Sequence, residues 1–187
     1  MHVFVTGGTG LIGSAVVADL LANGHTVVAL ARSDAAVVAL ETAGAGTFRG
    51  GLADLDSLRV GAAQTDGVIH LAFGNDFSSP DALAHAVAEE SAALATLGEE
   101  LIGSDRPFVT VSGTPPVAGR VSTEADPLPT GGPVGGRARS VTAVLGLATR
   151  GVRSCSLAAY RPQRGQRRVC RLADQHGAPK RSIGISR

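Results

Sequence analysis

Short apolar runs alternate with longer stretches of helical periodicity along most of this chain. Runs of strand length occupy residues 2–6, 26–31, 46–49, 67–71 and 107–112. The stretch from Ile12 to Leu21, and those after the later runs, repeat apolar residues at the spacing of a helix face. Alternating strands and helices predict an α/β fold with a doubly wound parallel sheet in three layers. Largely apolar strands such as Phe108–Val111 suit a sheet that is covered on both faces.

The longest predicted helix covers residues 79–102. Its start is indicated by Ser78, with Pro80 suited to the first turn and Asp81 three positions after the serine. Apolar residues at helical spacing are expected to pack on the sheet, and they are Leu83, Val87, Leu94, Leu97 and Leu101. The same helix carries acidic residues that are expected to face solvent, namely Glu89, Glu90, Glu99 and Glu100.

The pattern changes after position 113. Residues 113–136 are rich in Pro, Gly, Thr and Ser, which predicts a long loop, and helical spacing resumes over residues 140–150. A sixth strand is expected near Gly151, but from Arg153 onward the apolar pattern gives way to arginine, glycine, glutamine and proline. We therefore predict a folded domain over residues 1–152 and an Arg-rich tail over residues 153–187 that cannot form a core.

Two hypotheses account for this tail. A basic nucleic-acid-binding segment is one, but aromatic residues are not interleaved with its arginines and Tyr160 is its sole aromatic. We favour a frameshifted translation of DNA that once encoded the sixth strand and a substrate-binding lobe, because the pattern changes abruptly within an expected strand. Translating the coding DNA in the other frames tests this hypothesis, which fails if no frame restores an apolar strand.

Composition narrows the class of protein. The chain has 187 residues, 44% of them hydrophobic, and a net charge of +1, so one globular domain is expected and a nucleic-acid partner is not. No sequence typical of a signal peptide or membrane span is present, which predicts a cytoplasmic protein. Cys155 and Cys170 lack the close spacing of a zinc or redox motif, so two reduced cysteines and no metal site are expected.

The segment between the first predicted strand and helix, Thr6 to Gly13, has the sequence TGGTGLIG. Glycines at this spacing permit a tight turn, a close approach to phosphate and tight packing of helix on strand. Backbone N–H groups and the positive end of the helix dipole then bind an anion. We predict a dinucleotide pyrophosphate site formed by Gly7, Gly10, Leu11, Ile12 and Gly13. A glycine-rich turn that binds nothing is the alternative.

The residues after the second predicted strand bear on which dinucleotide binds. An acidic side chain there accepts hydrogen bonds from a ribose 2′-hydroxyl, whereas an arginine suits a 2′-phosphate. This chain has Arg32, which can bond phosphate in a bidentate manner, and Ser33, which can add a hydroxyl donor. The prediction is NADP, with NAD left open because Asp34 could turn toward a ribose. A solvated Arg32 at the start of a surface loop is the other alternative.

The stretch from Met1 to about Val152 resembles the short-chain dehydrogenase/reductase superfamily, most closely the extended and atypical branches that include NAD-dependent epimerase/dehydratase proteins. Thr6–Gly13 is similar to the extended-type glycine motif, and Asp66–Phe73 to the fourth-strand segment. The resemblance implies that Leu71, Ala72 and Phe73 border the adenosine and nicotinamide ribose. It also places Ser112 where the family carries its active-site hydroxyl, and it likens residues 123–127 to the loop before the catalytic helix.

The departures from the family pattern concern both ends of the cofactor. The family has a tyrosine general acid/base and, four residues later, a lysine that lowers its pKa; here Arg137 and Val141 stand at those places. Arginine stays protonated at working pH and valine offers no donor, so neither can act in the usual way. At the adenine end the family's Asp-Leu pair is Gly51-Leu52 here, which leaves Leu52 as the expected contact.

Three functional hypotheses follow. The leading one is an NADP-dependent oxidoreductase that passes hydride between nicotinamide and a small carbonyl, alcohol or sugar-like substrate, with Ser112 bonding the substrate oxygen and Arg137 stabilising an oxyanion. The second is a nucleotide-binding sensor without catalysis, and the third is a fragment inactive for want of a substrate lobe. The resemblance also suggests a homodimer formed through the helix 79–102.

Overall fold

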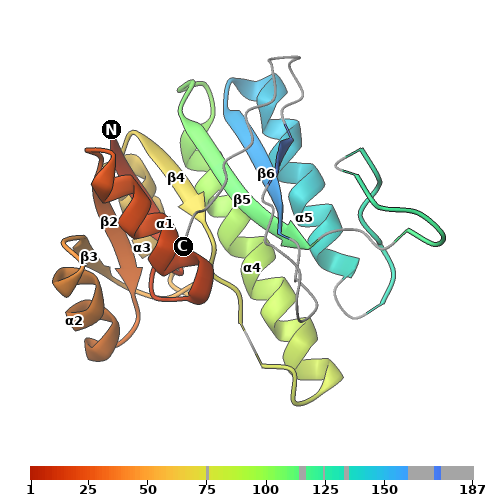
Figure 1. The fold of residues 1–187 in the computed structure, drawn as a ribbon, viewed down its shortest axis with the longest axis horizontal. Coiled ribbons are helices and arrows are strands. Elements are labelled where there is room, and N and C mark those ends of the chain that lie inside the picture. The colour runs from red at the N-terminus through yellow and green to blue at the C-terminus, as the bar shows by residue number, and fades with distance from the viewer. Residues whose placement is uncertain (75, 114–116, 124, 133–134, 160–170, 174–187) are drawn as a thin grey trace.

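A seven-stranded sheet runs through the molecule in the order β3-β2-β1-β4-β5-β6-β7 (Figure 1). The structure is a computed structural model that describes residues 1–74, 76–113, 117–123, 125–132, 135–159 and 171–173. All neighbouring strands from β3 to β6 are parallel, and β7 is antiparallel to β6. The strands are β1 (His2–Thr6), β2 (Thr26–Ala31), β3 (Gly46–Arg49), β4 (Gly67–His70), β5 (Pro107–Gly113), β6 (Arg153–Ala159) and β7 (Arg171–Ala173). The predicted fold class is confirmed.

Helices connect the parallel strands and cover the sheet. They are α1 (Leu11–Ala22), α2 (Asp34–Thr42), α3 (Leu55–Ala63), α4 (Pro80–Leu101), α5 (Gly135–Gly146) and the 3₁₀ helix η1 (Leu147–Arg150). Asp54 caps α3 by accepting a hydrogen bond from the Ser57 amide, as expected of an acidic residue at a helix start. The prediction that Ser78 starts the long helix is wrong by one residue: Ser79 caps α4 by accepting from the Ala82 amide, and Pro80 is the first helical residue.

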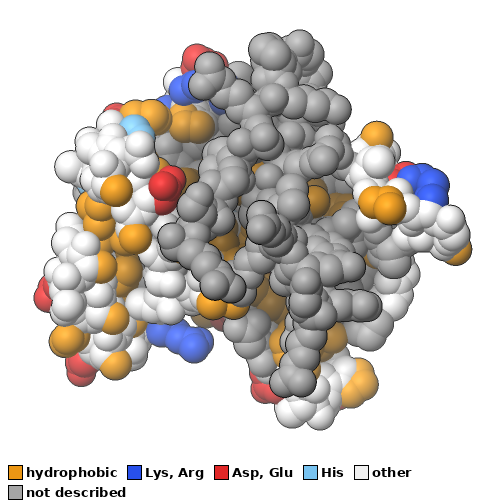
Figure 2. Space-filling model, viewed as in Figure 1, with side chains coloured by type: hydrophobic (Ala, Val, Ile, Leu, Met, Phe, Trp, Pro, Cys, Tyr) orange, Lys and Arg blue, Asp and Glu red, His pale blue; other side chains and the backbone are white. Residues whose placement is uncertain are grey.

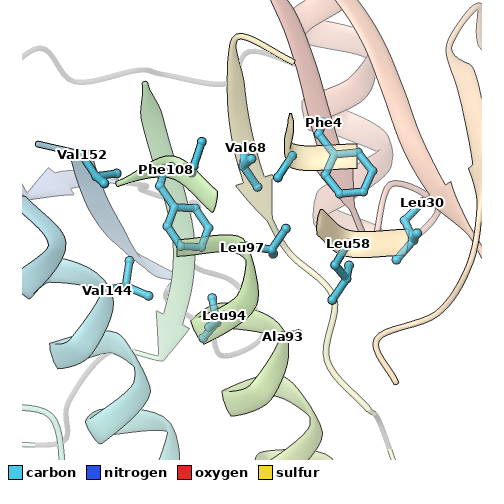
Figure 3. Close-up of a cluster of buried hydrophobic side chains, with 12 residues drawn as sticks. Phe4, Leu30, Leu58, Val68, Ala93, Leu94, Leu97, Phe108, Val144 and Val152 are labelled. Atoms are coloured by element: carbon cyan, nitrogen blue, oxygen red, sulfur yellow. The ribbon is translucent and has the colours of Figure 1, made fainter. Parts of the chain in front are cut away.

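The core consists of two clusters on opposite faces of the sheet, because successive side chains of a strand point to opposite sides. Val3 and Val5 of β1 pack with α1 and α2, whereas Phe4 packs toward α3 and α4 (Figure 3). The Phe4 ring lies against the backbone of α3 at Gly61, where an added Cβ would be 2.4 Å from the ring. Glycine at this position therefore lets α3 approach the sheet over a bulky aromatic residue.

The sixth strand is present, so the expectation that the chain is unfolded from Arg153 onward is wrong for residues 153–159. Residues 153–159 pair in parallel with β5 over seven register positions, from Pro107↔Arg153 to Gly113↔Ala159. The sequence of this strand, RSCSLAA, has few large apolar residues, so its pairing with β5 defines it better than its own pattern does. Folded structure thus continues past the predicted boundary at 152. Residues 160–170 and 174–187, including Tyr160 and Cys170, lie outside the described residues, and the frameshift hypothesis stays a prediction.

Arg106, just before β5, holds the amino-terminal edge of the sheet together. Its guanidinium donates to the Ala62 and Thr65 carbonyls at 2.6 and 2.9 Å and to the Glu100 carbonyl at 2.8 Å. These carbonyls lie at or near the ends of α3 and α4, where helices leave acceptors without partners and favour a positive charge. One side chain therefore fixes both helices relative to β5. No helix in the described ranges is long and apolar enough to cross a membrane.

Candidate functional site

The glycine turn between β1 and α1 is built so tightly that side chains are excluded. Gly7 has φ +72°, and a Cβ added there would lie 2.7 Å from the Ala72 backbone nitrogen after β4. A Cβ at Gly13 would lie 2.0 Å from the Gly7 carbonyl oxygen, so α1 packs directly on the turn. The Gly10 amide donates to the Gly7 carbonyl at 3.0 Å and closes the turn. Two of the three predicted reasons for glycine, the tight turn and the close packing of the helix, are found here, and the approach to phosphate stays a prediction.

The start of α1 offers backbone donors without internal partners. Its N-cap, Gly10, supplies no side-chain hydrogen bond, and the first turn contains no acidic residue. The first amides of a helix lack acceptors within the helix, and the dipole makes this end positive. Leu11 is 75% exposed and Ile12 43% exposed, and hydrophobic side chains gather on the surface over α1 and α2 (Figure 2). The predicted anion site is therefore accessible and carries apolar side chains at its rim.

The end of β2 presents Arg32, whose side chain is exposed. Ser33 caps α2 by accepting from the Ala36 amide at 3.2 Å, which leaves its hydroxyl hydrogen able to donate. Asp34, the residue considered for a ribose contact, forms an ion pair with Arg49, and that hydrogen bond lowers the pKa of Asp34. Its carboxylate is thus engaged at the neighbouring strand, while Arg32 is exposed.

The ends of β1 and β4 are joined beside the glycine turn. The Leu71 amide donates to the Thr6 carbonyl at 3.1 Å, and the Ala72 amide donates to the Thr6 hydroxyl at 3.4 Å. This is the point where the strand order reverses, and in such sheets ligands bind outside the carboxyl ends of the strands at that point. In Figure 1 the arrows of β2 and β4 point toward this edge. Leu71, Ala72 and Phe73 follow β4 beside the turn, and their contact with a bound cofactor stays a prediction.

Leu52 lies on the other side of this edge, after β3. With Ala53, Leu55, His85, Ala88, Glu89 and Ala92 it lines an apolar depression of about 230 Å³ between the start of α3 and α4. Leu52 is half-buried and packs against the core cluster below β1 and β4. An apolar side chain at this place can contact a planar ring by dispersion, but the Gly51 position supplies no carboxylate for an amino group.

A buried ion pair joins α4 and α5 behind the ends of β4 and β5. Arg137 donates through Nε and Nη2 to the two carboxylate oxygens of Glu90, each at 2.7 Å, and through Nη2 to the Val111 carbonyl at 3.4 Å. Its guanidinium also lies over the Phe73 ring, 4.3 Å from the centroid. The Glu90 side chain is only 3% exposed and that of Arg137 22%. The prediction that Glu90 faces solvent is therefore wrong.

Sequence spacing contained the signal for this burial. Glu90 lies between Val87 and Leu94 at intervals of three and four residues, so it falls on the inner stripe of α4. Its charge made the solvent-facing interpretation attractive, and the partner that stabilises it is 47 positions away. Val141, at the lysine place of the family pattern, is buried as well, so α5 offers no second donor there.

Ser112 and a row of polar residues lie on the same sheet face as this pair. Ser112 is 8% exposed near the end of β5, next to the Val111 carbonyl that Arg137 contacts. Thr6, His70 and Thr110 are register neighbours on β1, β4 and β5 and are almost fully buried. The Thr6 hydroxyl bonds His70 Nδ1 at 3.0 Å. His70 Nε2 and the Thr110 hydroxyl have no hydrogen-bond partner among the described residues.

His70 is neutral at physiological pH in these surroundings. Burial, and after it the positive charge of Arg137, lowers the pKa of His70 from 6.5 to about 4, with the Ala72 backbone acting in the opposite direction. A neutral imidazole can exchange a proton between its two nitrogens. The site therefore combines one neutral histidine, the hydroxyls of Thr6, Thr110 and Ser112, and a guanidinium that is paired with Glu90.

These elements are those of a dinucleotide-binding sheet, and comparison with known proteins identifies the family. Residues 3–133 match the model of the NAD dependent epimerase/dehydratase family. The chain belongs to this family. The resemblance drawn from the sequence is thereby confirmed. The glycine turn has no room for side chains, and the first amides of α1 have no partner within the helix. Both features fit the pyrophosphate of the NAD(P) that this family binds.

Two curated relatives and one solved structure are similar to this chain. It is 40% identical over 159 residues to the uncharacterized protein C2A9.02 of Schizosaccharomyces pombe, covering 84% of this chain and 52% of that one. It is 35% identical over 85 residues, 46% of this chain and 25% of that one, to the 4-hydroxy-2-methyl-3-oxo-4-farnesyl-3,4-dihydroquinoline-1-oxide ketoreductase of Stigmatella aurantiaca. A short-chain dehydrogenase/reductase superfamily protein from Agrobacterium tumefaciens, solved with bound NAD, superposes with a TM-score of 0.67 at 22% identity, covering 84% of this chain and 48% of that one.

The extent of these matches bears on what the chain contains. It spans 52% of the length of the fission yeast relative and 48% of the Agrobacterium protein. The matched part is the sheet with its glycine turn. Glu124, within the segment 123–127 of the sequence comparison, lies outside the described residues.

Proposed function

We propose that this chain binds NADP at the glycine turn and acts as an oxidoreductase on a small carbonyl, alcohol or sugar-like substrate. The observation that carries the proposal is the start of α1, where free amides meet a turn that excludes side chains at the switch point of the sheet. The ketoreductase relative supports carbonyl chemistry. The nicotinamide, when bound, supplies or accepts the hydride.

The residues around β5 would bind and orient the substrate oxygen. Arg137 uses Nε and Nη2 on Glu90 and Val111, and no described residue accepts from its Nη1 group. That group has two N–H donors for an oxygen that becomes negative during reduction. The Ser112 hydroxyl, on the same face near the end of β5, would add a third donor. The Phe73 ring, stacked on the guanidinium, limits how far Arg137 can move.

A nucleotide-binding sensor without catalysis is the second candidate. An arginine side chain cannot act as a general acid in proteins, and Val141 is buried and apolar, so the described residues at these two places cannot deliver a proton as the family's tyrosine and lysine do. A direct test is to follow NADPH absorbance with a panel of aldehydes and ketones. Turnover supports the oxidoreductase, whereas tight NADP binding without turnover supports the sensor.

The preference for NADP is proposed from the end of β2. Arg32 is exposed and Asp34 is held by Arg49, so a guanidinium rather than a carboxylate is available to the ribose 2′ position. Charge-assisted hydrogen bonds contribute about 1.5–3 kcal/mol, so Arg32→Gln should weaken NADP binding roughly tenfold to a hundredfold and leave NAD binding unchanged. Calorimetric titration of both dinucleotides measures this ratio, and Arg59→Gln, an exposed arginine of α3, is the control.

The outcomes separate two parts of the proposal. A native chain that binds NAD and NADP equally well would refute the 2′-phosphate role of Arg32 but keep the dinucleotide site. A folded chain that binds neither would refute the proposed function.

We also propose a cytoplasmic homodimer formed through α4. Sedimentation of the chain at several concentrations would test that association.

A further inference from the structure

The ion pair between Glu90 and Arg137 lies behind the part of the site that would hold nicotinamide. We propose that this pair keeps the protein interior behind the ends of β4 and β5, next to the nicotinamide site, electrically neutral. The pair thereby fixes the relative affinity for oxidised and reduced dinucleotide. The inference rests on the proposed function, because it concerns the same dinucleotide site. It assigns to Glu90 a positioning and charge-balancing role that goes beyond holding α4 and α5 together.

The placement of the pair follows from the topology of the sheet. A dinucleotide that crosses the switch point has its pyrophosphate at the start of α1, one nucleoside over β2 and β3, and the other over β4 and β5. Since Arg32 lies at the end of β2, nicotinamide belongs to the β4 and β5 half. Arg137 reaches this half at two points, the Val111 carbonyl at 3.4 Å and the Phe73 ring at 4.3 Å.

The charges at this place are known from the geometry. Both oxygens of Glu90 receive a hydrogen bond of 2.7 Å from Arg137, so the pair as a whole carries no net charge. His70, the titratable group on the adjoining strand, is neutral at physiological pH because its pKa lies at about 4. Removal of one member of the pair therefore leaves a net charge in a region of low water content.

The two redox forms of the cofactor respond differently to such a charge. The nicotinamide ring of NADP⁺ is positively charged, whereas that of NADPH is neutral, and the rest of the molecule is the same. A positive residue left unbalanced would disfavour the oxidised form selectively, and an unbalanced carboxylate would favour it. A unit charge about 10 Å away at an effective dielectric constant of about 20 changes the affinity ratio roughly tenfold.

The experiment measures dissociation constants of NADP⁺ and NADPH by calorimetry at pH 7.5 for the full chain and four variants. Glu90→Gln should shift the ratio about tenfold toward NADPH, and Arg137→Gln about tenfold toward NADP⁺. The double variant Glu90→Gln with Arg137→Gln is neutral again and should return to the native ratio. Arg137→Lys keeps the charge but loses the bidentate geometry, and its ratio should stay near native.

Matched controls lie on the same two helices. Glu99→Gln on α4 and Arg139→Gln on α5 remove exposed charges and should leave the ratio unchanged, because solvent screens them. If Arg137→Gln fails to fold, Glu90→Gln against Arg137→Lys decides the question, since only Glu90→Gln changes the net charge of the pair. A structural role alone would alter stability and both affinities together without moving their ratio.

The possible failures are distinguishable. If the variants fold and bind both forms with the native ratio, the inference is overturned while the dinucleotide site stands. If a single charge removal moves the ratio in the direction opposite to that expected, the inference is also overturned. If the native chain binds neither NADP⁺ nor NADPH, the proposed function itself is overturned.

Discussion

Backbone atoms form the candidate site at the start of α1, whereas side chains form it behind the ends of β4 and β5. At α1 the ligand-binding groups are amides, and their arrangement depends on Gly7 and Gly13, which lie within one short segment. Behind β5 the paired residues Glu90 and Arg137 lie on two different helices and are 47 positions apart in the sequence. The glycine turn therefore depends on its shape, and added side-chain atoms disturb it. The Glu90–Arg137 pair depends on charge balance, and loss of one partner leaves the other charge buried.

Removal of Arg137 should give the largest effect and sharpen this contrast. Arg137→Met leaves Glu90, 3% exposed, without its partner, and breaking a buried pair in this way costs about 3–5 kcal/mol of unfolding free energy. Glu90→Gln should cost less, because the Arg137 side chain is 22% exposed and can reach water. Urea unfolding of both variants measures the difference. Equal losses, or losses below about 1 kcal/mol, would mean that the pair is not effectively buried.

His70, on β4, offers a test of the region formed by buried side chains. Because burial lowers the pKa of His70 in the folded chain from 6.5 to about 4, the unfolded chain binds the proton more readily between these pH values. Stability should therefore fall as the pH drops from 6.5 toward 4, by at most about 3 kcal/mol. The loss is absent above pH 6.5, where both states are neutral.

Substitution isolates the contribution of His70. In His70→Asn, urea unfolding between pH 7 and pH 4.5 should show a flatter dependence on pH than in the native chain. His85→Asn, which removes an exposed histidine of α4, should keep the native slope. If His70→Asn retains the full acid slope, the imidazole titrates in the folded state near its ordinary value.

The glycine turn should respond to one added methyl group, with a smaller effect on stability. A Cβ at Gly13 would be 2.0 Å from the Gly7 carbonyl oxygen, whereas one at Gly10 would be 3.3 Å from it. Gly13→Ala should therefore cost about 2 kcal/mol by overpacking and also weaken NADP binding. Gly10→Ala should fold almost normally yet weaken binding, since it fills space next to the phosphate. Thermal unfolding with and without NADP separates the two effects, and full binding by both variants would contradict the site.

The comparison also explains what the sequence could predict. Residues 2–6, 26–31 and 46–49 were predicted as strands with the bounds that the structure has, because apolar runs between turns identify parallel strands directly. The glycine turn was predictable for the same reason, since its function depends on residues close together in the chain. A sixth strand is expected near Gly151, but its extent over Arg153–Ala159 could not be predicted, because this segment relies on hydrogen bonds to β5 rather than on large apolar side chains.

The interior polar residues were harder to predict. Glu90 has the spacing of a core residue and the chemistry of a surface residue, and only the position of Arg137 decides between them. Likewise, nothing local to Asp34 indicates that its carboxylate is held by Arg49. Charged groups find partners across the fold, so their burial is determined by tertiary structure and not by their neighbours in sequence.

Phe4 and Gly61 form a matched set across two elements of the core, because the ring occupies the space that a side chain on α3 would need. The side chain at position 4 therefore limits the size of the side chain at position 61. A larger residue at position 61 would fit only with a smaller residue at position 4. Any redesign of this interior, or any natural drift within it, must treat the two sites as one unit whose summed volume is conserved.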